Sequence, residues 1–134
     1  MASGERASRS CPCAEGKGSS GSSSESRVLP PSREQMGRAS WKLLHRAVAH
    51  FPDNPGAVDR RRVFFWLISF ASLYPCSICR SAFLSIILQH RPNTSSQRDL
   101  VLWACRVHNA VNDDLSLPIF NCLDPQLFAR RLST

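Results

Sequence analysis

The sequence predicts an all-α fold, a four-helix bundle with a short additional C-terminal helix. Apolar residues recur at helical rather than strand spacing from residue 34 onward, and proline-containing breaks divide this part of the chain into four segments of helical length. No repeated strand pattern and no glycine-rich strand-to-helix turn occurs. Four helices joined by short loops are typical of an antiparallel bundle.

The 134-residue chain divides into two parts of different composition. Residues 1–33 are rich in Ser and Gly and contain almost no apolar residue before Val28. Such a segment cannot bury enough apolar surface to offset the entropy lost on ordering. We therefore expect a flexible tail over 1–33 and a compact domain over 34–134. A domain of this size has a modest core and benefits from a disulfide or a tightly bound ligand.

The first two helices are expected over residues 34–50 and 57–73. In the first, Trp41 and Val48 lie seven residues apart on one apolar face. The second is apolar through most of its length and ends before Pro75, because the residue preceding a proline is pushed out of the helical region.

The third and fourth helices follow after short breaks. The third is expected over residues 76–89. Ser96 is then a typical N-cap, with the acidic Asp99 in the favourable first turn, and this helix is expected to end near residue 114. Residues 124–132 are expected to form the short final helix.

The net charge of +7 suggests at first a partner with many phosphates. The charge is spread along the chain, however, and the one dense run, at residues 60–62, lacks the interleaved aromatic residues of single-strand binders. A solvated helix face explains this run better, so no nucleic-acid partner is expected. The longest apolar run, residues 63–74, is too short to span a bilayer, and no membrane span is expected.

The six cysteines carry the strongest chemical signal, because this number is high for a reducing compartment without metal or redox work. By spacing, the pairs are Cys11 with Cys13, Cys76 with Cys79, and Cys105 with Cys122.

A Cys-x-x-Cys motif is typical of a zinc site, a redox disulfide or two buried thiols. Zinc needs four ligands, usually from two such motifs, so no metal is expected. The positive end of a helix beginning at Pro75 would stabilise a thiolate, which favours the redox reading of residues 76–79. The last pair is either a disulfide that pins the C-terminal loop to the fourth helix or two free buried cysteines.

Polar residues on otherwise apolar helices indicate a second possible feature. Trp41 and His45 share one face of the first helix, and His108, Asn109 and Asn112 fall within about one turn of the fourth. Each could be a satisfied core residue. Together they favour a pocket for a flat ligand with a polar rim, in which the indole stacks and the polar groups form hydrogen bonds.

Four motifs occur in order over about residues 33–122: GRASWKLLH at 37–45, YPCSIC at 74–79, CRVHNAVN at 105–112 and FNC at 120–122. Together they closely resemble the ERV/ALR family of FAD-linked sulfhydryl oxidases. The resemblance implies a helical bundle that holds FAD at its mouth, a structural disulfide between Cys105 and Cys122, and catalysis by Cys76 and Cys79. It implies that Cys79 lies against the flavin ring while Cys76 is the more exposed sulfur. The residues implied to contact FAD are Gly37, Arg38, Ser40, Trp41, His45, Cys79, His108, Asn109, Val111, Asn112, Leu115 and Leu117.

The resemblance also implies partners. Electrons would pass from thiol-containing protein substrates through the cysteine pair and FAD to dioxygen, giving hydrogen peroxide, or to cytochrome c. Cys11 and Cys13 could act as a shuttle, although relatives usually have one more residue between such cysteines. A non-covalent homodimer is expected, since Leu29 stands where some relatives have an intersubunit cysteine. Leu117 stands where a lysine is common. The implied location is the mitochondrial intermembrane space. The alternative function is a non-catalytic helical interaction module stabilised by disulfides or zinc.

Overall fold

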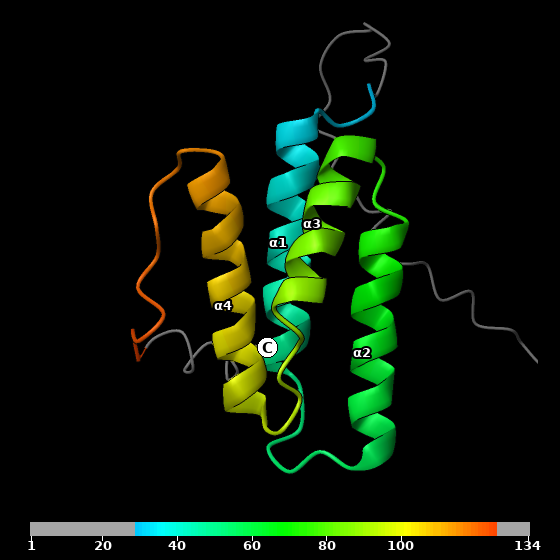
Figure 1. Cartoon of the computed structure of the whole chain (residues 1–134), viewed down its shortest axis with the longest axis vertical. Coiled ribbons are helices and arrows are strands. Elements are labelled where there is room, and N and C mark those ends of the chain that lie inside the picture. Colours follow the sequence, from blue (N-terminus) through cyan, green and yellow to red (C-terminus); the bar gives the residue numbers. More distant parts are fainter. Residues whose placement is uncertain (1–28, 126–134) are drawn as a thin grey trace, which may run out of the picture. The chain divides into compact units, whose positions relative to one another are not determined.

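The computed structural model describes residues 29–125, which form four helices (Figure 1). These are α1 (Arg33–Ala49), α2 (Ala57–Ser72), α3 (Ser77–Gln89) and α4 (Gln97–Asp114). They belong to one compact unit that begins at Pro31. The described residues contain no strand, and each helix begins and ends within one residue of its predicted bounds, so the all-α prediction is confirmed. Most of the predicted final helix, from residue 126 on, lies outside the described residues.

Side chains at the helix starts explain why the helices begin where they do. The Ser32 hydroxyl accepts the backbone N–H of Gln35, whose side chain accepts the backbone N–H of Ser32, a reciprocal capping box before α1. The Ser96 hydroxyl accepts the backbone N–H of Asp99 at 3.1 Å, which confirms the predicted N-cap of α4. The N-cap of α3 is a cysteine, Cys76.

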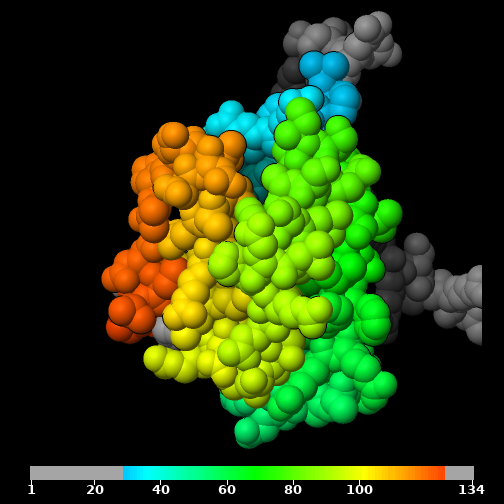
Figure 2. All heavy atoms as spheres, in the orientation of Figure 1, coloured from blue at the N-terminus to red at the C-terminus, as the bar shows by residue number. Residues whose placement is uncertain are grey.

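Helix α4 packs against both α1 and α3, and α3 also packs against α2. The Gln97 side-chain amide donates to the carbonyl of Ala49, so the start of α4 lies at the end of α1 and the two helices run antiparallel. The Trp103 indole N–H donates to the carbonyl of His90 at 2.7 Å and ties α4 to the end of α3. Figure 2 shows α3 and α4 side by side, covering much of α1 on this face.

The hydrophobic core is formed by the second halves of α1, α2 and α3, by Phe51 and by the first part of α4. Its buried members are Leu44, Val48, Phe51, Leu67, Ala71, Ile86, Ile87, Leu100, Val101, Trp103, Ala104 and Val107. Full burial of each large apolar side chain stabilises the fold by roughly 1.5–3 kcal/mol. The motif residues lie along α1, at the start of α3 and along the second half of α4. None of the described helices is long and apolar enough to cross a membrane.

Candidate redox and cofactor site

Two thiols lie at the N-terminus of α3. Cys76 occupies the N-cap, and its backbone N–H donates to the carbonyl of Tyr74 at 2.9 Å. Its sulfur accepts the backbone N–H of Cys79 at 3.4 Å. Both cysteines are free thiols in this structure. The sulfur of Cys76 therefore takes the place that a serine or threonine oxygen takes at an ordinary helix start.

The two thiols differ in acidity because one donates to the other. The pKa of Cys76 is lowered, first by the hydrogen bond from the Cys79 thiol, then by the backbone N–H of Cys79 and more weakly by the charge of Arg33. The pKa of Cys79 is raised, first because its proton is held by Cys76 and next by burial. Cys76 is therefore the sulfur that loses its proton first. Thiolate is the form that attacks disulfides.

The exposure of the two cysteine residues is the reverse of the order that the resemblance implied for their sulfurs. Cys76 is 8 % exposed, whereas Cys79 is an exposed residue. The cause lies in the capping geometry, since the Cys76 sulfur turns inward over the helix start to reach a backbone N–H. Cys79 lies in the first helical turn.

An aromatic and imidazole cluster joins helices α1, α3 and α4. The rings of Trp41 and His108 stack with centroids 4.0 Å apart and an interplanar angle of 10°. His45 Nε2 and His108 Nδ1 lie 2.8 Å apart, within hydrogen-bonding distance, and Phe83 presents its ring at 83° to Trp41. Phe83 is one turn after Cys79, on the same face of α3. The structure thus brings together Trp41, His45 and His108, as the sequence predicted.

The burial of His108 predicts a pH-dependent contribution to stability. Burial lowers the pKa of His108 below its ordinary value of 6.5. As the pH falls, the His108 imidazole therefore takes up a proton in the unfolded chain before it does so in the folded chain. Because protonation then favours the unfolded chain, the free energy of unfolding is expected to fall as the pH drops below 6.5. His108→Asn should flatten this dependence in urea denaturation at a series of pH values. His90→Asn, at an exposed histidine, is the matched control. An identical slope in His108→Asn and wild type would show that His108 is not the group responsible.

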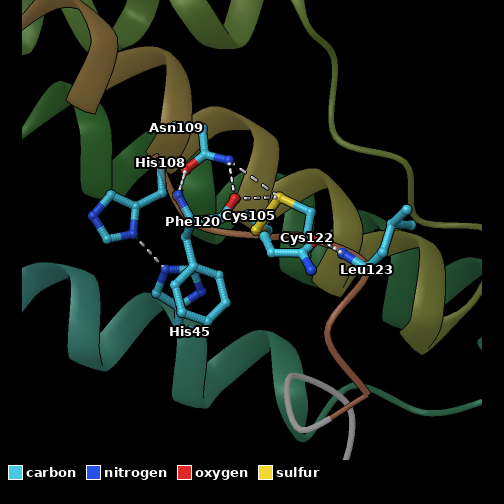
Figure 3. The surroundings of a disulfide bond; sticks show 8 residues. His45, Cys105, His108, Asn109, Phe120, Cys122 and Leu123 are labelled. Atoms are coloured by element: carbon cyan, nitrogen blue, oxygen red, sulfur yellow. Dashed lines mark hydrogen bonds between the residues drawn. A yellow bond between two sulfur atoms is a disulfide. The ribbon is translucent and has the colours of Figure 1, made fainter. Parts of the chain in front are cut away.

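A disulfide and an amide clamp hold the chain after α4 against that helix (Figure 3). Cys105 and Cys122 are bonded, so the disulfide interpretation of this pair is confirmed. One turn along α4, Asn109 Nδ2 donates to the carbonyl of Phe120 at 2.8 Å, and Asn109 Oδ1 accepts the backbone N–H of Phe120 at 2.9 Å. Nδ2 also lies 3.3 Å from the Cys122 sulfur. Both polar ends of Asn109 therefore bind the returning chain, a role that the sequence did not indicate.

Replacing this amide by a carboxylate tests the clamp. In Asn109→Asp one oxygen can still accept the Phe120 N–H, but the other replaces a donor and faces the Phe120 carbonyl. We expect a loss of about 1–3 kcal/mol in the free energy of unfolding, measured by urea denaturation. Asn93→Asp is the matched control, because the Asn93 side chain only accepts, from the backbone N–H of Ser95. Equal stability of the two variants would contradict the clamp.

The other residues predicted to contact a cofactor differ in solvent exposure. Gly37, Ser40, Val111 and Asn112 are half-buried, whereas Arg38, Leu115 and Leu117 are exposed. The Arg38 side chain pairs with Glu34 one turn earlier on α1. Ser40 lines a separate hollow of about 350 Å³ with side chains from the end of α2, namely Trp66, Ser69 and Phe70, and with Leu73, Tyr74 and Pro75. Cys11 and Cys13 lie outside the described residues.

Sequence reasoning missed three residues that shape the site. Phe83 contacts the Trp41 ring, Phe120 receives the Asn109 clamp, and Arg80 bonds the carbonyl of Tyr74 just before the thiol pair. Arg80 and Phe83 each had a usable signal, because they lie four residues after Cys76 and Cys79 and so one helical turn away. Within residues 29–125, no group of three or more His, Cys, Asp or Glu side chains is placed to hold a metal ion.

The side chains of the cluster fit a flat ring with hydrogen-bonding edges. Trp41 supplies aromatic surface, His45 and His108 supply ring nitrogens, and the half-buried Asn112 side chain makes no hydrogen bond to other described residues. Because Trp41 and His108 contact each other face to face, a planar ligand must lie beside this stack or separate the two rings.

Comparisons with known proteins place this site in a family. The Erv1 / Alr family matches residues 38–131. The chain is 37% identical over 90 residues to the FAD-linked sulfhydryl oxidase ERV2 of Saccharomyces cerevisiae, covering 67% of this chain and 46% of the relative. It is 37% identical over 102 residues to the mitochondrial FAD-linked sulfhydryl oxidase ERV1 of the same yeast, covering 76% of this chain and 54% of the relative. The chain thus spans about half the length of these curated relatives.

A solved structure gives the same answer for the fold. The crystal structure of the yeast Erv1 core superimposes with a TM-score of 0.73 at 35% identity, over 83% of this chain and 92% of that one. The matched segment contains the thiol pair, the aromatic and imidazole cluster and the Cys105–Cys122 disulfide. The chain therefore belongs to the Erv1/Alr family.

Proposed function

We propose that this chain is an FAD-dependent thiol oxidase that forms disulfides in protein substrates. The observation that carries the proposal is the Cys76 sulfur at the N-cap of α3, where hydrogen bonds favour its thiolate. The same helix carries Phe83, whose ring contacts a cluster suited to a flat ring. The relatives are named FAD-linked sulfhydryl oxidases, which supports the same activity.

The proposed chemistry at the cysteine pair is thiol–disulfide exchange. A substrate thiolate attacks the Cys76 sulfur of the oxidised Cys76–Cys79 pair, forms a mixed disulfide and releases the Cys79 thiolate. A second substrate thiolate then attacks the substrate sulfur and releases the Cys76 thiolate. The substrate leaves as a disulfide, and the pair has gained two electrons. The lowered pKa of Cys76 makes its sulfur a good leaving group in this second step.

The cofactor would lie on the Cys79 side of the pair. Cys79 and Phe83 share one face of α3, and the Phe83 ring contacts Trp41. Trp41, His45, His108 and Asn112 would hold the ring. FAD, when bound, supplies the two-electron acceptor that reoxidises the pair. The final acceptor in this proposal is dioxygen, giving hydrogen peroxide, or cytochrome c.

The proposal also covers how electrons reach Cys76 and in which compartment the protein works. Cys11 and Cys13 would pass electrons to Cys76, since a tethered pair has a high effective concentration there. The proposed location is the mitochondrial intermembrane space, supported by two relatives whose names describe them as mitochondrial.

A non-covalent homodimer is also proposed. Val58, Phe65 and Leu73 lie seven and eight residues apart, so they form one stripe along α2 and its C-cap, and they are 59%, 63% and 79% exposed. An exposed apolar stripe of this kind is suited to burial against a second copy. Leu29, which cannot form a disulfide, is exposed before α1.

The experiment that tests the proposed function is oxygen uptake by the purified full-length chain after incubation with FAD. A yellow protein that consumes oxygen when a dithiol is added, and produces hydrogen peroxide, is the expected result. A protein that stays colourless after incubation and consumes no oxygen would contradict the oxidase and favour the interaction module.

A further inference from the structure

Arg80, in the first turn of α3, reaches back over the turn that precedes the helix. Its Nε and Nη2 donate to the backbone carbonyl of Tyr74 at 3.1 and 2.9 Å. The same oxygen accepts the backbone N–H of Cys76 at 2.9 Å. Three donors therefore converge on one carbonyl, two residues before the more acidic thiol.

Arg80 also bonds the cysteine itself through the main chain. Its backbone N–H donates to the carbonyl of Cys76 at 2.8 Å, the first helical hydrogen bond of α3. The backbone N–H of Arg80 thus binds the carbonyl of Cys76. The side chain of Arg80 binds the carbonyl of Tyr74, which also accepts the backbone N–H of Cys76. Both ends of the N-cap residue are fixed relative to the helix.

We propose that Arg80 is a positioning residue for Cys76: its forked guanidinium fixes the Tyr74–Cys76 turn, so that the Cys76 sulfur stays at the N-cap of α3. Only there can the sulfur accept the N–H of Cys79 and face the positive end of the helix. The use of this thiolate in turnover rests on the proposed function, but the positioning itself does not.

A different role for Arg80 would be that of a nearby positive charge. Lysine separates the two roles, because it keeps the charge but cannot place two rigid N–H donors on one carbonyl. If the fork is what matters, Arg80→Lys should resemble Arg80→Met. If charge is what matters, Arg80→Lys should resemble wild type.

The test is the pH profile of Cys76 alkylation by iodoacetamide in the full-length chain. Cys11→Ser, Cys13→Ser and Cys79→Ser leave Cys76 as the one free thiol, because Cys105 and Cys122 are bonded to each other, and the backbone N–H of residue 79 is retained. At neutral pH, Arg80→Met and Arg80→Lys are each expected to react about fivefold more slowly than the parent, the effect of losing roughly one hydrogen bond. The midpoints of their profiles should lie at higher pH, because a raised pKa leaves less thiolate at neutral pH, and the rates should converge at high pH.

Arg60→Met is the control, since Arg60 lies in the first turn of the preceding helix, far along the chain from Tyr74. Its profile should match that of the parent. If the pH profile of Arg80→Lys matches that of the parent, the positioning role is overturned, whatever the profile of Arg80→Met. Circular dichroism shows whether each variant is folded, and if Arg80→Met does not fold, the result for Arg80→Lys alone decides. Alkylation needs neither FAD nor oxygen, so a failure of the proposed oxidase would appear in oxygen uptake and not in this measurement.

Discussion

Cys76→Ser and Cys79→Ser are each expected to reduce thiol-dependent oxygen uptake by at least about 10³-fold while the chain stays folded. Serine has nearly the shape of cysteine, and at residue 76 it can still cap α3 through its hydroxyl. It cannot form a disulfide, so no electrons can enter through the pair. The measurement is oxygen consumption with a dithiol, together with the FAD content of each variant.

Ser77→Ala is the matched control for these two substitutions. Ser77 lies between the two cysteines and is exposed, so its removal tests whether any change in this turn stops the reaction. It should keep most of the oxygen uptake. Turnover comparable to wild type in either cysteine variant, with FAD bound, would remove the pair from the proposed pathway.

Removal of the Cys105–Cys122 disulfide is expected to have the largest effect on stability. The two cysteines are 17 residues apart, and closing a loop of this length stabilises the fold by about 3 kcal/mol in the chain-entropy model. The Asn109 clamp on Phe120 remains in the variant, so we expect the returning segment to loosen without loss of the helices. Urea denaturation of Cys105→Ser/Cys122→Ser measures the change.

The single variant Cys122→Ser provides the internal check. If the covalent link is the source of stability, the single and double variants should lose nearly the same free energy of unfolding, because either one breaks the bond. A loss below about 1 kcal/mol in both would contradict the stabilising role, since that is the size of one ordinary hydrogen bond.

The helices could be predicted from the sequence because their signals are local. Pro75 and the Ser96 cap mark helix ends within a few residues, and the spacing of apolar residues defines each buried face. The contact between Trp41, His45 and His108 could also be predicted from the sequence, because these residues on two packed amphipathic helices face a common interior. Neither inference needed knowledge of how the loops run.

The parts that could not be predicted depend on loops and on the directions of side chains. Asn109 was expected to face a ligand, but its amide binds the backbone of Phe120, and no local pattern shows where that segment returns. The order of exposure of Cys76 and Cys79 depends on which sulfur caps the helix. The bond from Arg80 to a carbonyl six residues earlier requires the geometry of the turn.

The most direct test of the redox assignment is an anaerobic titration of the FAD-loaded full-length chain with dithiothreitol, followed by visible absorbance. The account predicts that wild type loses its flavin absorbance rapidly, because electrons pass from dithiol to Cys76–Cys79 and then to the cofactor. The double variant Cys76→Ser/Cys79→Ser should keep its colour at least about 10²-fold longer. Equal rates of bleaching in the two proteins would show that electrons reach the flavin without the cysteine pair, and would contradict the account.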